Sequence, residues 1–242
     1  MTSRELVALQ FAYHDNCYHD NLSKLLTLIK QSDEDAVVLA PELCLTNFSF
    51  DKMEEAAAFG EEALKKILPL SKTRIIAFTL TEKRDGKFYN TSKILFGEKV
   101  VHSQDKVNLF KFGAEHDYFE AGSEEKVKIV EIDGLRFAIL ICFEIRFTAL
   151  WDLIRGADVI MIPALWGKLR KSQFESITTA MAIINQAFVI AADSSQDDMA
   201  SSSGIITPFG EALRDDSKEF LSLDANLQEI KKMRRYMDIG LS

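Results

Sequence analysis

Short runs of apolar, β-branched residues alternate along this chain with longer segments of helical periodicity. The short runs are typical of strands; they are Leu6–Phe11, Ala36–Ala40, Arg74–Leu80, Lys93–Phe96, Val127–Ile132, Leu135–Ile141, Asp158–Ile162, Ala187–Ala191 and Gly204–Thr207. The longer segments predict helices over Asn21–Lys30, Glu54–Leu68, Phe147–Arg155, Ser172–Asn185 and Asn226–Tyr236. In the first of these, leucine and isoleucine recur at i, i+3, i+4 and i+7 from Leu22, which makes one apolar face.

The order of these elements predicts a mixed α/β architecture. Strands that alternate with helices pair in parallel through right-handed crossovers. The middle of the chain differs, because residues 74–101 form consecutive strands with turn residues at Arg84-Asp85-Gly86 and Gly97-Glu98. That pattern predicts an antiparallel meander within the same architecture.

Composition narrows the class of protein. With 242 residues, 47% of them apolar, we expect residues 1–242 to form one large domain that needs no disulfide or metal for stability. The net charge of −8 argues against a nucleic-acid or anionic-membrane partner, and no apolar run approaches the ~18 residues of a membrane span. The three cysteines show no metal-ligand spacing, and the N-terminus lacks the long apolar core of a signal peptide. Both observations favour a reducing, cytoplasmic location.

Candidate chemistry follows three of the predicted strands. In parallel sheets, ligands bind beyond the carboxyl ends of the strands. Pro41-Glu42 follows the second strand, Cys142-Phe143 follows the run that starts at Leu135, and Pro163 to Trp166 follows the next. A carboxylate, a thiol and an aromatic ring are therefore expected at equivalent strand ends.

Cys142 stands between an apolar strand and a predicted helix. A cysteine on such a turn is expected at the exposed top of the sheet, near helix N–H groups that lower the thiol pKa and can hold an oxyanion. The alternative is a buried cysteine that merely ends a core strand. Glu42 is correspondingly a general base with a raised pKa or a rim carboxylate paired with a lysine.

Lys106 and the Glu115-His116 pair are further candidate site residues, although the sequence around them does not define a role. Lys106, after a strand that ends near Val101, is by itself most simply a solvated surface residue. Glu115 and His116 follow nine and ten residues later, and His116 is a candidate base for a Cys–His pair. The histidines and aspartates of the HDNCYHD segment at 14–20 match no standard metal-site spacing.

Taken together, these segments resemble the nitrilase, or carbon–nitrogen hydrolase, superfamily. The resemblance rests on P-E-L-C-L-T-N-F-S-F at 41–50, D-K-V-N-L-F at 105–110, A-E-H-D-Y-F-E-A-G at 114–122 and I-C-F-E-I-R-F at 141–147, and a further similar segment runs from Arg170 to Val189. It implies a four-layer αββα sandwich with mixed sheets, and commonly a homodimer that packs sandwich on sandwich.

The resemblance also implies site residues and a mechanism. The family's catalytic triad falls on Glu42, Lys106 and Cys142, and its second glutamate falls on Glu115, while His116 becomes a scaffold residue. Cys142 then attacks an amide carbonyl, Glu42 shuttles the proton, and Lys106 with the Phe143 N–H stabilises the oxyanion. No metal or organic cofactor is required.

The expected activity is cleavage of a small terminal amide to carboxylate and ammonia, of the ω-amidase type. The alternatives are hydrolysis of N-carbamoyl amines or amino acids, and a non-catalytic binding module with the same fold. We expect Phe143 and Trp166 to form an apolar wall and Arg170, within the Lys168–Lys171 cluster, to bind a substrate carboxylate. Arg146 is the other candidate, but we expect it to pair with a carboxylate such as Glu144 or Asp152.

Overall fold

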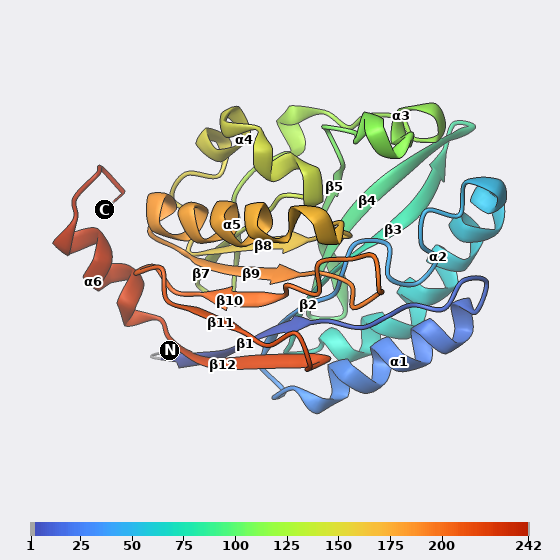
Figure 1. Ribbon diagram of the computed structural model, residues 1–242. Coiled ribbons are helices and arrows are strands. Elements are labelled where there is room, and N and C mark those ends of the chain that lie inside the picture. The colour runs from blue at the N-terminus through green and yellow to red at the C-terminus, as the bar shows by residue number, and fades with distance from the viewer. Residues whose placement is uncertain (1–2, 242) are drawn as a thin grey trace.

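Two six-stranded sheets pack face to face in the computed structural model, which describes residues 3–241 (Figure 1). The first sheet has the order β12-β1-β2-β3-β4-β5, with strands β1 (Ser3–Leu9), β2 (Val37–Leu39), β3 (Ile75–Arg84), β4 (Lys87–Phe96), β5 (Lys99–Asp105) and β12 (Phe220–Asn226). The second has the order β11-β10-β9-β8-β7-β6, with strands β6 (Val130–Ile132), β7 (Leu135–Ile139), β8 (Val159–Pro163), β9 (Phe188–Ala192), β10 (Gly204–Ile206) and β11 (Ala212–Arg214). Parallel pairs occupy the middle of each sheet and antiparallel pairs the edges.

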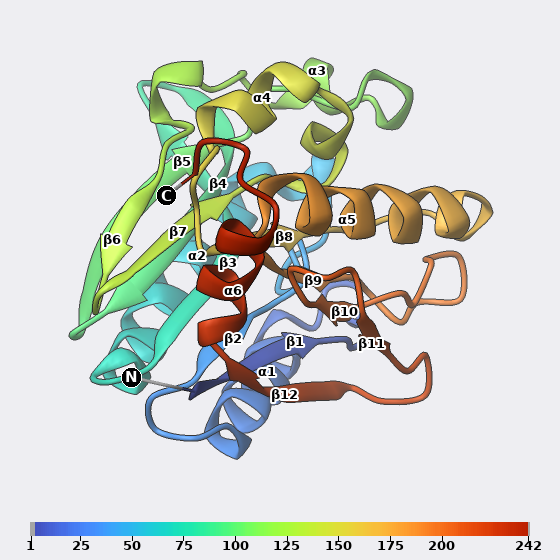
Figure 2. The same cartoon turned by 90° about the vertical axis from the view of Figure 1, so that its left-hand side faces the viewer.

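Helices cover the outer faces of both sheets. Helices α1 (Tyr18–Gln31) and α2 (Met53–Ile67) lie against the first sheet, and α4 (Thr148–Leu153) and α5 (Lys171–Asn185) against the second (Figure 1). The short helix α3 (Glu115–Tyr118) follows β5, and α6 (Gln228–Tyr236) follows β12 and faces the viewer in Figure 2.

Alternation of side chains along the strands produces three apolar layers. In β1, Leu6 and Ala8 point into the core between the sheets, whereas Val7 and Leu9 pack under α1 and α2. In β7, Ile139 faces the other sheet and its neighbours face α4 and α5. Every central strand is thus buried on both faces, as the continuous apolar runs predicted, and the αββα sandwich is confirmed.

Two differences from the predicted elements lie where buried strands carry polar residues. Strand β4 begins at Lys87 rather than Lys93, and it includes Asn90, Thr91 and Ser92, whose side chains are fully buried. Strand β5 continues to Asp105 instead of ending near Val101. Residues 87–92 lie within the span 74–101 for which the sequence predicts consecutive strands, and their backbones pair in that meander.

Within residues 3–241, no helix combines the length and the apolar character needed to cross a membrane.

Candidate active site

The candidate residues meet where the carboxyl ends of the central strands of both sheets lie together. Glu42 follows β2 in the first sheet, and its backbone N–H donates to the carbonyl of Ala164, which follows β8 in the second sheet, at 3.1 Å. Lys106 directly follows β5, and Cys142 begins the 3₁₀ helix η5 (Cys142–Arg146) after β7. Each sheet therefore contributes part of one site.

Lys106 lies between two carboxylates. Its side chain is completely buried, and its Nζ lies 2.7 Å from Oε1 of Glu42 and 2.7 Å from Oε1 of Glu115. Glu115 is fixed in turn, because its Oε2 accepts the backbone N–H of Phe110 at 3.1 Å. The Nζ also lies 5.8 Å from the centroid of the Phe48 ring.

The Lys106 ammonium and the carboxylates of Glu42 and Glu115 stabilise one another's charged forms. Burial alone would lower the pKa of Lys106, but the carboxylates of Glu42 and Glu115 outweigh it and raise the pKa above its ordinary value. Burial raises the pKa of Glu115, and the Lys106 ammonium counteracts part of that rise. Lys106 is therefore a fixed cation at neutral pH.

Two residues that the sequence did not single out hold Glu42, one through its carboxylate and the other through the adjacent turn. The Nδ2 of Asn90 on β4 donates to its Oε1 at 2.8 Å, alongside Lys106. The Thr79 hydroxyl accepts the backbone N–H of Leu43 at 2.6 Å and so holds the turn that carries Glu42. Oε1 of Glu42 is thus occupied twice, whereas Oε2 is buried with no hydrogen-bond partner. That second oxygen is the one available to take a proton.

The loop that carries Lys106 depends on a glycine. The N–H of Gly122 donates to the Lys106 carbonyl at 2.9 Å. A Cβ at Gly122 would lie 2.5 Å from the Asp105 carbonyl oxygen, so only glycine permits this close approach. This close approach explains why the 114–122 segment ends in glycine.

Cys142 lies on a sharp turn with a left-handed backbone, at φ +49°. A non-glycine residue in this region costs about 1–3 kcal/mol and persists where the surrounding structure holds it. The turn is closed by Glu144, whose Oε2 accepts the backbone N–H of Ile141 at 2.6 Å.

Two expectations about the Cys142 thiol are wrong. The residue is only 7% exposed rather than open to solvent. Burial, followed by the nearby Glu42 carboxylate, raises the pKa of the thiol well above its usual value. Lys106 and the backbone N–H of Leu165 act in the opposite direction without reversing the shift. The resting residue is a protonated thiol beside a carboxylate.

A cavity of about 700 Å³ opens onto Cys142. Aromatic and charged residues are prominent in its lining. The lining residues include Phe48, Phe110, Phe143, Trp166, Glu115, Arg146, Arg170 and Asp198.

Two arginines line the cavity, each against an aromatic ring. The guanidinium of Arg146 lies 4.9 Å from the Trp166 ring centroid, and that of Arg170 lies 5.5 Å from the Phe110 centroid. The pairing expected for Arg146 with Glu144 or Asp152 is wrong, because its guanidinium donates to Oε1 of Gln173 at 2.5 Å.

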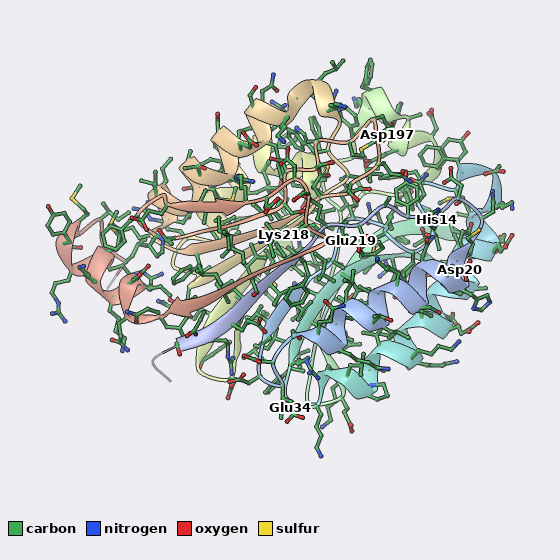
Figure 3. All side chains as sticks on the ribbon, turned by 60° about the horizontal axis from the view of Figure 1, so that its bottom comes forward. His14, Asp20, Glu34, Asp197, Lys218 and Glu219 are labelled. Atoms are coloured by element: carbon green, nitrogen blue, oxygen red, sulfur yellow. The ribbon has the colours of Figure 1, made fainter. Side chains whose placement is uncertain are left out.

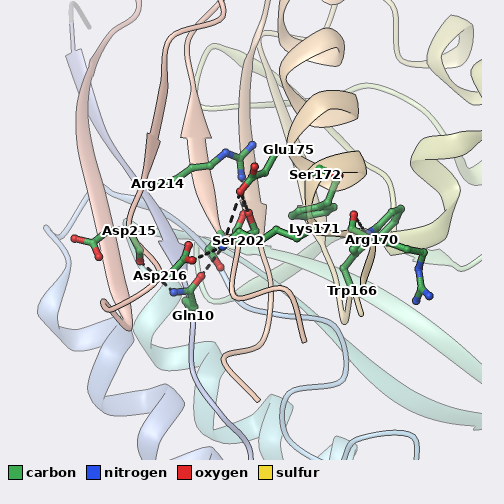
Figure 4. A network of polar contacts seen from close by, with 12 residues as sticks. Gln10, Trp166, Arg170, Lys171, Ser172, Glu175, Ser202, Arg214, Asp215 and Asp216 are labelled. Atoms are coloured by element: carbon green, nitrogen blue, oxygen red, sulfur yellow. Dashed lines mark hydrogen bonds and ion pairs between the residues drawn. The ribbon is translucent and has the colours of Figure 1, made fainter. Parts of the chain in front are cut away.

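Of the Lys168–Lys171 cluster, only Arg170 lines this cavity. Lys171 extends away from it toward Asp216, with which it forms an ion pair (Figure 4). Lys168 donates to the Asp197 carbonyl at 3.3 Å. The Trp166 indole N–H donates to the Arg170 carbonyl at 2.9 Å and so joins the aromatic wall to the base of α5 (Figure 4).

A further buried carboxylate, Asp193, holds the Trp166 wall in place. It follows β9 and accepts the backbone N–H of Trp166 at 2.7 Å. Burial raises the pKa of Asp193 to about 7, although backbone N–H groups lower it. The sequence gives one usable signal for this residue, an aspartate directly after a buried strand.

The histidines lie outside the cluster. His116 is exposed and its Nε2 lies 3.5 Å from Oδ1 of Asp117, consistent with a scaffold position. His14 and Asp20 lie at the surface around the start of α1 (Figure 3). No group of three or more His, Cys, Asp or Glu residues in the described part of the chain is arranged to hold a metal ion.

Known proteins resemble this chain in sequence or in fold. A family model described as Carbon-nitrogen hydrolase matches residues 10–235. The chain is 30% identical over 246 residues to the 2-oxoglutaramate amidase of Bacillus subtilis (strain 168), covering 96% of this chain and 94% of that protein. It is also 30% identical over 209 residues to Omega-amidase YafV of Escherichia coli (strain K12), covering 84% and 80% of the two chains.

Among solved structures, Saccharomyces cerevisiae Nit3, described as a member of branch 10 of the nitrilase superfamily, superposes with a TM-score of 0.87. The two chains are 19% identical, and the match covers 99% of this chain and 96% of Nit3. At this identity the likeness is one of fold.

Proposed function

Because this chain belongs to the carbon–nitrogen hydrolase family, we propose that it hydrolyses the terminal amide of a small carboxylic-acid monoamide, with Cys142 as nucleophile. The products are a carboxylate and ammonia, and a thioester on Cys142 is the intermediate. The observation that carries the proposal is the buried cluster itself: the Lys106 ammonium lies 2.7 Å from two carboxylates beside a thiol on a strained turn. Burying three ionisable groups around one thiol has a large energetic cost, which a catalytic role explains.

The proposed reaction begins with proton transfer. Since the resting thiol is protonated, Oε2 of Glu42 accepts its proton as the sulfur attacks the amide carbon. Lys106 and the Phe143 N–H stabilise the developing oxyanion, and one such donor is typically worth about 3 kcal/mol.

The same glutamate serves both halves of the reaction. Glu42 passes the proton to the departing nitrogen when the C–N bond breaks, and ammonia leaves. It then removes a proton from water, whose oxygen attacks the thioester, and it returns that proton to the sulfur as the C–S bond breaks, which releases the acid and the Cys142 thiol. Glu115 keeps Lys106 charged and in place throughout.

The substrate class follows from the cavity. Phe143 and Trp166 supply apolar walls, and Arg146 and Arg170 are cations that a substrate carboxylate can reach after entering the cavity. Two relatives are named for ω-amide substrates, 2-oxoglutaramate amidase and Omega-amidase, which supports a substrate that carries both an amide and a carboxylate.

Ammonia release from a matched substrate panel tests the proposal. The panel contains monoamides of four- and five-carbon dicarboxylic acids, their methyl esters, and N-carbamoyl amino acids. A charge-assisted hydrogen bond is worth about 1.5–3 kcal/mol, so the free acids should exceed the esters at least about tenfold in kcat/KM. Faster turnover of the carbamoyl compounds, or none on any amide, would reject the proposal.

Two variants decide which arginine binds the carboxylate. Arg170→Gln and Arg146→Gln each remove one cation from the cavity, and we expect Arg170→Gln to abolish the preference for acid over ester. Lys168→Gln is the matched control, since it removes a neighbouring charge that does not line the cavity. Loss of the preference in Arg146→Gln alone would assign the role to Arg146.

We further propose a homodimer that packs through the helices outside the second sheet. Leu153 on α4 and Ile184 on α5 are 43% and 56% exposed, which leaves apolar area on this face. Light scattering should give the mass of two chains, and Ile184→Glu should give the mass of one.

We also propose a cytoplasmic location. Cys17 is an exposed free thiol, and free thiols are kept reduced in the cytoplasm.

A further inference from the structure

The Glu144 side chain forms hydrogen bonds with both loops that carry the proposed reacting groups, Cys142 and Lys106. Glu144 lies on η5, two residues after Cys142, and its Oε2 accepts the N–H of Ile141, the residue before the nucleophile, at 2.6 Å. Its Oε1 accepts the N–H of Val107, the residue after Lys106, at 2.6 Å. The first loop belongs to the second sheet and the other loop to the first sheet.

The chemistry of this connection requires a carboxylate. The Glu144 side chain is completely buried, and both of its oxygens accept hydrogen bonds from backbone N–H groups. An amide of the same shape has one acceptor oxygen and would turn an NH₂ group against the second N–H. Burial raises the pKa of Glu144 to about 7, and the N–H groups of Ile141 and Val107 oppose that rise.

We propose that Glu144 is a positioning residue that sets the distance between the Cys142 thiol and the Lys106 ammonium across the two sheets. The inference rests on the proposed function, since it assigns the reaction to those two groups. Each hydrogen bond is made one residue from a reacting residue, so losing either one shifts the geometry of attack. A misplacement of about 1 Å can reduce turnover about 100-fold.

Steady-state kinetics of Glu144→Gln is the primary test. This variant keeps the side-chain volume and one acceptor, and we expect kcat to fall at least about 100-fold while KM changes by less than about threefold. Glu144→Asp restores the carboxylate on a shorter stem and should recover at least about tenfold of that loss. A lower melting temperature with unchanged kcat, or no recovery in Glu144→Asp, would overturn the proposal.

Asp158→Asn is the matched control. Asp158 is a mostly buried carboxylate that precedes β8 and pairs with Arg136 and Arg234, at the end of the strand away from the site. The control should lower stability and leave kcat unchanged. An equal loss of kcat in both variants would mean that the Glu144 effect is one of general stability, and the proposal would fail.

A second measurement does not depend on amide turnover. The rate of iodoacetamide labelling at Cys142, mapped by peptide mass, reports the thiol pKa, with the exposed Cys17 as internal reference. Burial and the carboxylates of Glu42 and Glu115 raise that pKa, and the Lys106 ammonium lowers it. Releasing the Lys106 loop in Glu144→Gln should therefore move the pH midpoint of labelling upward by at least about half a unit.

The two measurements separate the two proposals. A wild-type protein that releases no ammonia rejects the proposed function, while the labelling midpoint still tests the position of Lys106. An unchanged midpoint in Glu144→Gln rejects the positioning role even if amide hydrolysis is found.

Discussion

Replacing Lys106 by methionine should make the stability of this protein strongly dependent on pH. Methionine fills a similar volume but removes the ammonium that lies 2.7 Å from both Glu42 and Glu115, and all three side chains are at least 95% buried. Removing one partner of a buried ion pair typically costs about 3–5 kcal/mol, because the remaining charge stays buried without compensation. We expect a loss of that size at pH 8.

The direction of the pH effect follows from the two remaining carboxylates. Without Lys106, burial and repulsion from the Glu42 carboxylate raise the pKa of Glu115 above the unfolded value of about 4.3. The folded state then binds more protons than the unfolded state, so stability falls as the pH rises through the raised folded pKa and is recovered as the pH falls toward 4.3. Between the unfolded pKa and the raised folded pKa, each pH unit changes the free energy of unfolding by about 1.4 kcal/mol per proton.

Urea unfolding of both proteins at pH 5, 6, 7 and 8 measures this dependence. The deficit of Lys106→Met should be smallest at pH 5 and largest at pH 8. The double variant Lys106→Met/Glu115→Gln removes one carboxylate, so it should be more stable than the single variant at pH 8 and less dependent on pH. A deficit of equal size at pH 5 and pH 8 would refute the reasoning, because it would mean that lost packing rather than uncompensated charge is responsible.

Three further substitutions test other parts of the site. Cys142→Ala should abolish ammonia release while the circular dichroism spectrum is retained; measurable turnover would remove Cys142 as nucleophile. Asn90→Ala deletes a donor to Glu42 and should lower kcat at least about tenfold, because the position of the proton shuttle is less fixed; an unchanged kcat would contradict this. Asp193→Asn should raise KM more than it lowers kcat, because Asp193 holds the backbone of the Trp166 wall rather than the reacting atoms; steady-state kinetics showing the reverse split would refute that role.

The sequence predicted best those features that a regular pattern of side chains determines. The central strands are apolar on both faces and the helices have one apolar face, so the layers and the parallel pairs follow directly. The predicted strand at 93–96 was too short, because residues 87–92 are mostly polar and their buried side chains are satisfied by groups distant in sequence. Asn90, for example, donates to a residue 48 positions away.

The site was predicted in part for the same reason. Three of the residues, Glu42, Lys106 and Cys142, follow strands, and Glu115 lies in a family-like segment at the start of α3. The structure brings all four together. The thiol pKa was predicted in the wrong direction, since the turn geometry is local but the burial that dominates comes from loops far away in sequence. The partner of Arg146 was wrong because the apparent candidate, Glu144, is occupied by two backbone N–H groups.

The pairing of β1 has a consequence for the synthesis of this protein. All seven residues of β1 pair with β12, from Ser3 opposite Asn226 to Leu9 opposite Phe220, while the other edge of β1 pairs with β2. A ribosome makes β1 first and β12 near the end of the described chain, so at about 5–20 residues per second the strand waits on the order of 10–40 s for its second neighbour. During that time an apolar strand keeps an open hydrogen-bonding edge, which is the kind of surface that recruits other nascent chains. Chaperone binding to the growing chain should therefore persist until residues 220–226 have left the exit tunnel.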